Sequence, residues 1–328
     1  MKVSLFIHKS VKTSLVVFTL FSSLFISCKI AKQSAASSHA TSFSVATTIF
    51  APYDFTRQII AGTDTQVTML LPPGAEVHSW EPSAQDILTI QQSGLFIYAG
   101  GEGDAWADDL VSSLDKKVPS VRMTDCVKLF EEAHPDGMEP EEDDDGGDGA
   151  QEVEWDEHVW TSPKNAMLIV NRICDTLCAL DKKNSALYRK NADSYLGQLQ
   201  KLDDAFSDVV KKAKRNTIIF ADRFPARYFT EEFGLSYYAA FPGCSTNTEP
   251  SAATVAFIIT KVKEEKIPAV FYIELSNQKM ADTVCEATGC KKLLFNCCHN
   301  LSKSDFAAGK TYLSAMEDNV LTLTEALN

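Results

Sequence analysis

The chain has few of the features that usually identify an enzyme cofactor site or a nucleic-acid-binding surface. It has no pair of cysteines at CxxC spacing, which argues against a structural zinc knuckle. The glycine-rich stretch 100–103 lacks the third glycine of a dinucleotide-binding fingerprint, because Trp106 stands in its place. The formal net charge is −13, so nothing favours a nucleic-acid partner. What remains is a globular protein of 328 residues, long enough for two domains.

The apolar run over residues 14–27 is too short, and too often interrupted by serine, to predict a membrane-spanning helix. Three lysines precede it and Cys28 follows it, which is the pattern of a secretory signal peptide over residues 1–27. The end of this run resembles a bacterial lipobox, although Phe25 stands where leucine is usual. We therefore expect cleavage before Cys28, a lipid on its sulfur, and a small, serine-rich tether over residues 28–42.

Most of the negative charge lies in one segment. Residues 131–157 contain fourteen aspartates and glutamates and neither lysine nor arginine. Removal of residues 1–27 takes away three lysines and changes the formal net charge from −13 to −16. Because the segment 131–157 accounts for −14 of this charge, the rest of the chain carries only about −2. A run of like charges is usually a solvated, disordered loop, and that is the reading we favour. The alternative is that its carboxylates and His134 gather divalent cations loosely.

From residue 43 onward the sequence alternates between β-rich runs and helical stretches, and the alternation restarts after residue 215. Two such series predict an α/β fold of two lobes with mostly parallel sheets. The expected strands are 44–49, 67–71, 95–99, 120–123, 217–221, 236–241, 269–273 and 291–295. The expected helices are 52–61, 83–93, 104–115, 163–180, 185–214, 224–233, 251–265, 278–287 and 311–327.

The segment between the two series predicts one long helix. It has no proline, Gly197 is its only glycine, and its apolar residues keep helical spacing. About 28 residues would make a helix of about 42 Å, which suits a rigid strut between lobes. The expected division is an N-terminal lobe over 43–182 that includes the acidic segment, a linking helix over 183–214 and a C-terminal lobe over 215–328.

His78 is one of only six histidines, and it lies just past a predicted strand and a proline-proline-glycine turn. In open α/β sheets, ligands bind beyond the carboxyl ends of the strands. The position of His78 therefore makes it a candidate binding residue.

Four segments carry a family resemblance: PPGAEVHSWEPSAQDI at 72–87, DEHVWTSPKNA at 156–166, TEPSAATV at 248–255 and YLSAMEDN at 312–319. In this order, on either side of a long helix, they resemble the solute-binding lipoproteins of zinc and manganese ABC importers. The resemblance covers essentially all of residues 43–328.

The resemblance implies two βα lobes bridged by a long helix, with one divalent metal ion, zinc or manganese, held in the cleft. Carried over by motif, two of the ligands are His78 and His158. Asp156 and Glu76 lie nearby in sequence and are candidates to orient these rings. The resemblance also implies an ABC permease as partner, attachment to the membrane through Cys28, and a monomer outside the cytoplasm.

The other two family ligand positions fall on Arg223 and Asn296. An arginine side chain stays protonated and repels a metal cation, and an asparagine offers only a neutral oxygen. In a first reading, the metal binds His78 and His158 with substitute ligands. In a second, Arg223 acts as an internal cation paired with a carboxylate such as Glu274; in a third, it binds an anion or a metal chelate. The substitutes are Asp222, Glu274, Cys297, Cys298 and His299.

The function expected is capture of zinc or manganese outside the cytoplasm and delivery to a permease. The alternative is a surface interaction protein, or adhesin, that has kept the fold and lost the metal site; Arg223 and Asn296 favour it. We do not expect an enzyme, because no motif positions a general base beside His78 and His158.

Overall fold

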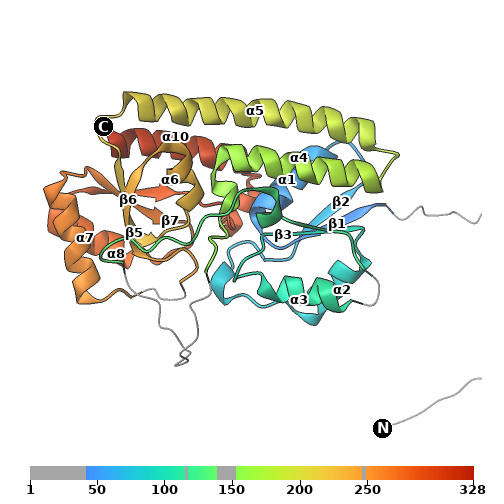
Figure 1. The fold of residues 1–328 in the computed structure, drawn as a ribbon, viewed down its shortest axis with the longest axis horizontal. Helices are drawn as coiled ribbons and strands as arrows, with labels where there is room; N and C mark the ends of the chain where they lie inside the picture. Colours follow the sequence, from blue (N-terminus) through green and yellow to red (C-terminus); the bar gives the residue numbers. More distant parts are fainter. Residues whose placement is uncertain (1–41, 115–116, 139–152, 246–248) are drawn as a thin grey trace, which may run out of the picture. The chain divides into compact units, whose positions relative to one another are not determined.

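Two four-stranded sheets, each with all its strands parallel, form the centres of the two lobes (Figure 1). The first sheet has the order β2-β1-β3-β4 and the second β6-β5-β7-β8. This confirms the predicted α/β architecture. The strands are β1 (Ser44–Thr47), β2 (Gln66–Met69), β3 (Leu95–Tyr98), β4 (Ser120–Arg122), β5 (Thr217–Arg223), β6 (Ser236–Phe241), β7 (Ala269–Ile273) and β8 (Lys291–Phe295).

The computed structural model describes residues 42–114, 117–138, 153–245 and 249–328. The predicted signal peptide, Cys28 and nearly all of the tether lie outside the described residues, as does the middle of the acidic segment. None of the described helices is long and apolar enough to cross a membrane.

The predicted helices are present in the predicted order with small shifts at their ends, and the short helix α9 (Lys303–Ala307) was not predicted. The α-helices are α1 (Phe50–Ile60), α2 (Ala84–Gln92), α3 (Ala105–Ser113), α4 (Pro163–Leu180), α5 (Ser185–Lys212), α6 (Arg227–Phe233), α7 (Ala252–Glu264), α8 (Lys279–Thr288), α9 (Lys303–Ala307) and α10 (Tyr312–Leu327). The 3-10 turns are η1 (Val77–Ser79), η2 (Thr124–Cys126) and η3 (Val159–Thr161).

The long helix α5 runs over both lobes, with α1 and α4 beneath one part of it and α10 beneath the other (Figure 1). Its buried side chains lie on one face and include Tyr195, Leu199 and Phe206. They belong to a single apolar core that contains residues of both sheets, among them Val45 of β1 and Phe220 of β5. Because the two lobes share this core, a large hinge opening would expose buried apolar surface, and the helix acts as a strut.

The start of the second lobe differs from the prediction. Strand β5 continues through Arg223 instead of ending at residue 221, and α6 begins at Arg227 instead of residue 224. Pro225 explains the shift, because the residue before a proline avoids the helical conformation. As a consequence Asp222 and Arg223 lie at the carboxyl end of a buried strand.

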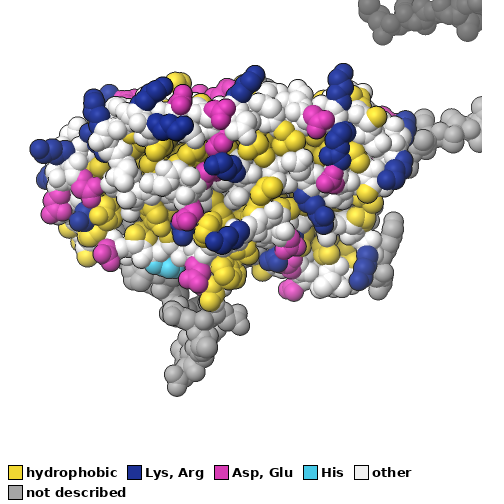
Figure 2. Space-filling model, turned by 45° about the horizontal axis from the view of Figure 1, so that its top comes forward, with side chains coloured by type: hydrophobic (Ala, Val, Ile, Leu, Met, Phe, Trp, Pro, Cys, Tyr) yellow, Lys and Arg dark blue, Asp and Glu magenta, His cyan; other side chains and the backbone are white. Residues whose placement is uncertain are grey.

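Lysine, arginine, aspartate and glutamate side chains are interspersed on the face that carries α5 (Figure 2). No broad area of this face is basic. Charges of both signs are therefore mixed over this face.

Candidate metal centre

His78 follows β2 on a turn that the second lobe holds in place. Asn300 donates its Nδ2–H groups to the carbonyl oxygens of Pro72 and Ala75, at 2.8 and 2.9 Å. Gly74 has a φ of 80°, which a glycine adopts without strain. The stiff turn that the sequence indicated is therefore held by hydrogen bonds from Asn300, and His78 follows it in η1.

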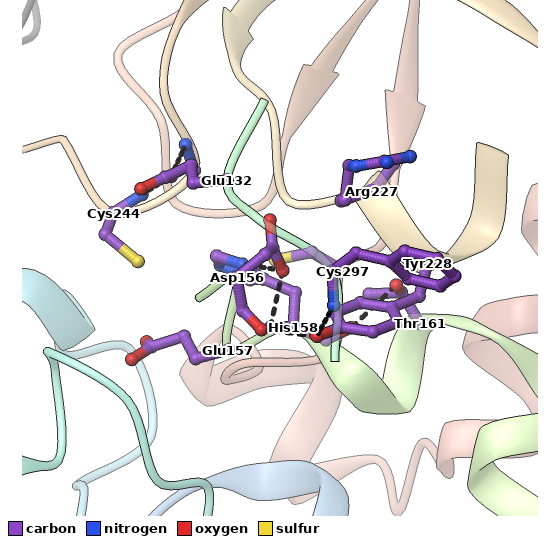
Figure 3. A network of polar contacts seen from close by, with 12 residues as sticks. Glu132, Asp156, Glu157, His158, Thr161, Arg227, Tyr228, Cys244 and Cys297 are labelled. Atoms are coloured by element: carbon purple, nitrogen blue, oxygen red, sulfur yellow. Dashed lines mark hydrogen bonds and ion pairs between the residues drawn. The ribbon is translucent and has the colours of Figure 1, made fainter. Parts of the chain in front are cut away.

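His158 is completely buried at the start of η3. Oδ1 of Asp156 accepts a hydrogen bond from the backbone N–H of His158 at 2.8 Å and lies 3.1 Å from its Nδ1 (Figure 3). Tyr228 of the second lobe donates to the backbone oxygen of Asp156 at 2.7 Å. Asp156 therefore orients the ring, as its position in the sequence suggested, and fixes a proton on Nδ1.

His299 lies on a turn just after β8. Its backbone oxygen accepts the N–H of Phe50, at the start of α1, at 2.8 Å. Glu274 accepts the backbone N–H of Cys297 at 2.7 Å and its thiol at 2.9 Å. Cys298 has a φ of 60°, so the chain reverses here. Nδ1 of His299 lies 3.5 Å from the sulfur of Cys297. Because the Cys297 thiol donates its proton to Glu274, Nδ1 of His299 is the donor in this contact. The other ring nitrogen, Nε2, is then the acceptor.

These three segments place His78, His158 and His299 in one cluster. One ring nitrogen of each lies within 4.8 Å of those of the other two. The ring centroids of His158 and His299 are 4.7 Å apart, and those of His78 and His299 are 5.5 Å apart. Nε2 of His158 and Nε2 of His299 are buried and have no hydrogen-bond partner among the described residues. Three imidazoles with two unused, buried lone pairs suit a first-row divalent ion.

The surroundings keep two of the rings neutral, which is the state that binds a metal. Burial, followed by the positive charge of Arg223, lowers the pKa of His78 to about 3. Burial also lowers the pKa of His299 well below its usual range. Burial also disfavours the charged form of His158. The nearby carboxylates, Asp156 above all, have the larger effect, and the pKa of His158 is raised. A metal ion therefore has no proton to displace from His78 or His299.

Arg223 lies beside this cluster and connects it to the first lobe. Its Nη1 lies 3.6 Å from Oε1 of Glu76, and its Nε donates to the carbonyl oxygen of Ser245. Glu76 also accepts the backbone N–H of His78 at 3.4 Å. An ion pair between Arg223 and Glu274 was one expectation from the sequence, and the structure gives Arg223 a different carboxylate. The reason is that the hydrogen bonds from the Cys297 turn occupy Glu274.

Two other candidate ligands hydrogen-bond to the protein itself. Asp222 accepts the backbone N–H groups of Arg223 and Ile273, at 2.9 and 3.2 Å. Asn296 is held by Asn319 of α10, which donates to its backbone oxygen at 2.9 Å and accepts its backbone N–H at 2.8 Å. The assignment of Asp222, Asn296 and Glu274 as ligands stays a prediction, and their contacts identify them as supports of the strand ends and the 297–299 turn.

His299 is the residue that sequence reasoning undervalued, since it appeared only among the substitutes for missing ligands. The signal was present: His299 lies four residues beyond the carboxyl end of β8, as His78 lies beyond β2. The same rule about strand ends that selected His78 applies to it.

An α/β protein of two lobes that share a core along one long helix, with a largely buried imidazole cluster where their loops meet, belongs to the class of solute-binding proteins. The chain belongs to the family described as zinc-uptake complex component A periplasmic (ZnuA), whose model matches residues 45–326.

The zinc-binding lipoprotein AdcA of Streptococcus pneumoniae (strain R6) is 32% identical over 315 residues, which are 96% of this chain and 60% of AdcA. The high-affinity zinc uptake system protein ZnuA of Bacillus subtilis (strain 168) is 30% identical over 299 residues, which are 90% of this chain and 91% of ZnuA. This chain thus spans about 60% of AdcA and most of the Bacillus protein.

Solved structures show the same fold. The Zn(II)-bound ZnuA-like domain of Streptococcus pneumoniae AdcA matches with a TM-score of 0.72 and 30% identity, over 87% of this chain and 99% of that domain. The laminin-binding protein Lbp of Streptococcus pyogenes shares the fold with a TM-score of 0.70 and 24% identity, over 88% of this chain and 99% of Lbp.

Proposed function

We propose that this protein captures Zn²⁺ outside the cytoplasm through His78, His158 and His299 and passes it to an ABC permease. The observation that carries the proposal is the convergence of three imidazoles from three distant segments, two of them with a buried Nε2 that has no partner among the described residues. The names of the similar zinc-binding and zinc-uptake proteins support the same metal.

Zinc fits this donor set better than manganese. All three donors are neutral nitrogen atoms, which suit zinc, whereas manganese favours carboxylate, carbonyl and water oxygen. Three protein ligands also leave one position of a tetrahedral zinc ion open. An open coordination position suits an ion that must be released, because a ligand from the receiving protein can bind the zinc ion there before the histidines dissociate from it.

Release then needs only a small motion. The Arg223–Glu76 ion pair and the Asn300 hydrogen bonds connect the lobes beside the site, whereas the core along α5 holds them together over a wide area. Local changes at the three histidine-bearing turns open the site at lower cost than a hinge motion. A lipid on Cys28 would keep the protein next to its permease. Binding and release involve no catalytic step, and one copy of the chain is sufficient.

Calorimetric titration of the purified protein with Zn²⁺ and with Mn²⁺ tests this function. We expect one tight zinc site per chain and weaker binding of manganese, with the zinc site strongly weakened by His78→Ala. His134→Ala is the matched control, because His134 is an exposed histidine in the acidic segment, and we expect it to leave the site unchanged. Only weak, non-stoichiometric heat in the wild type, as dispersed carboxylates give, would contradict the proposal.

A further inference from the structure

We propose that a second metal position, formed by Glu157, His158 and Cys244, lies next to the three-histidine site and shares His158 with it. The ligand atoms of these three residues lie within 4.8 Å of one another. Carboxylate, imidazole and thiolate are all ligands of zinc and of similar borderline or soft divalent ions. The inference builds on the proposed function, since it assigns a second resting place to the same ion.

Glu157 occupies a place that the backbone leaves open for it. Its Oε2 accepts the N–H of Gly103 at 2.9 Å. A Cβ atom on Gly101 would lie 2.6 Å from the Cβ of Glu157, and one on Gly103 would lie 2.8 Å from its Oε1. Gly101 also has a φ of 112°, which side-chain-bearing residues rarely adopt. The glycine-rich stretch that does not complete a dinucleotide fingerprint therefore has another role: it makes room for a buried carboxylate.

Cys244 is held against His158 from the second lobe. Oε1 of Glu132 accepts the backbone N–H groups of Gly243 and Cys244, at 2.7 and 3.3 Å. A Cβ atom on Gly243 would lie 2.7 Å from Cε1 of His158, so only a glycine lets this loop approach the ring so closely. In Figure 3, Cys244 and Glu157 lie on the same side of His158, with Tyr228 on the other side.

The proton on Nδ1 leaves Nε2 as the nitrogen of His158 that could bind a metal ion. Asp156 holds Nδ1, and the buried Nε2 has no hydrogen-bond partner among the described residues. A single lone pair binds one metal ion at a time, so the two positions are alternatives. One offers three imidazoles, and the other offers an imidazole, a carboxyl group and a thiol that must lose its proton to bind the metal, because burial raises the pKa of Cys244. In this proposal the ion stays bound to His158 while it exchanges His78 and His299 for Glu157 and Cys244.

Cobalt(II) tests this inference, because thiolate ligation gives a strong near-ultraviolet charge-transfer band that imidazole ligation does not. The variant His78→Ala/His299→Ala removes the first site and keeps the second. We expect it to bind Co²⁺ with the thiolate band, and we expect Cys244→Ser in this background to lose the band and to weaken binding about tenfold or more. Cys297→Ser in the same background is the control, because Cys297 is another thiol among the candidate ligands and hydrogen-bonds to Glu274 instead, and it should leave the band unchanged.

The outcomes separate this inference from the proposed function. If the wild type binds the metal and the folded double variant does not, the second position is excluded and the three-histidine site stands. A band that disappears with Cys297→Ser instead of Cys244→Ser also overturns the inference. If the wild type itself binds no metal, both proposals fail. Circular dichroism of each variant establishes that it is folded.

Discussion

Replacement of His158 by alanine is expected to weaken zinc binding more than any other single change at the site, by more than about a hundredfold. His158 is a ligand in both proposed positions, so no alternative arrangement of the ion avoids the loss. The change also leaves the buried carboxylate of Asp156 without the ring N–H that it accepts. Loss of a group that hydrogen-bonds to a metal ligand typically lowers the metal affinity 10–100-fold, and we expect loss of the ligand itself to lower it more. Competition with a chromophoric chelator measures this affinity.

Asp156→Asn provides a graded comparison for this prediction. Asparagine keeps the size of the side chain but removes the charge that supports the His158 ring, so we expect a loss of roughly 10–100-fold. The order wild type, Asp156→Asn, His158→Ala should hold at each pH where the variants are folded. If His158→Ala binds zinc as tightly as the wild type, His158 is not a ligand, and both proposed metal positions are wrong.

Replacement of Arg223 by glutamine is expected to tighten zinc binding by roughly tenfold, or about 1.4 kcal/mol. The guanidinium charge acts on His78 and on His299, and so also on an ion bound between them. Its removal also frees Glu76, which then adds a negative charge next to His78. A unit charge acting on a dication inside a protein readily supplies an effect of this size. Most of the change should appear as slower zinc release.

Arg223→Lys is the control, because it keeps the positive charge and loses the fork-shaped guanidinium. We expect its zinc affinity to stay close to that of the wild type. If Arg223→Gln binds zinc more weakly than the wild type, the role of Arg223 is to hold the two lobes together through Glu76. If neither variant binds differently, its charge does not act on the metal. Arg223 is therefore expected to keep the bound zinc ion exchangeable.

The order of helices and strands was predictable because each element carries a local signal. Strand β3 is a short apolar run, Ser162 and Pro163 mark the start of α4, and α5 keeps helical spacing over its length. The change at Pro225 was also within reach, because proline restricts the residue before it. The boundaries proposed between lobes and linking helix stay predictions.

The candidate site was only half predictable. His78 and His158 lie in motifs that the resemblance identifies, whereas His299 enters the cluster through a reversal at Cys298. A positive φ at a residue other than glycine cannot be read from sequence, and the turn is held here by Glu274, which lies 23 residues before Cys297. The ion pair between Arg223 and Glu76 joins residues of different lobes, so the sequence alone could not identify the partner of Arg223.

The adhesin alternative rested on Arg223 and Asn296 occupying family ligand positions. His299 completes a cluster of three histidines that needs neither Arg223 nor Asn296 as a ligand. The main reason for expecting that the metal site has been lost is therefore removed. A surface interaction on the same fold would remain the leading alternative if the metal titrations were negative.

A crystal structure of the zinc-loaded protein, with anomalous data collected at the zinc edge, tests the central claim most directly. The account predicts one strong peak at about 2.0–2.1 Å from nitrogen atoms of His78, His158 and His299, with Arg223 outside the coordination shell. A peak of lower occupancy beside Cys244 and Glu157 would fit the second position. A peak coordinated by Asp222, Glu274 or Asn296 without His299, or no peak near the three histidines, would contradict it.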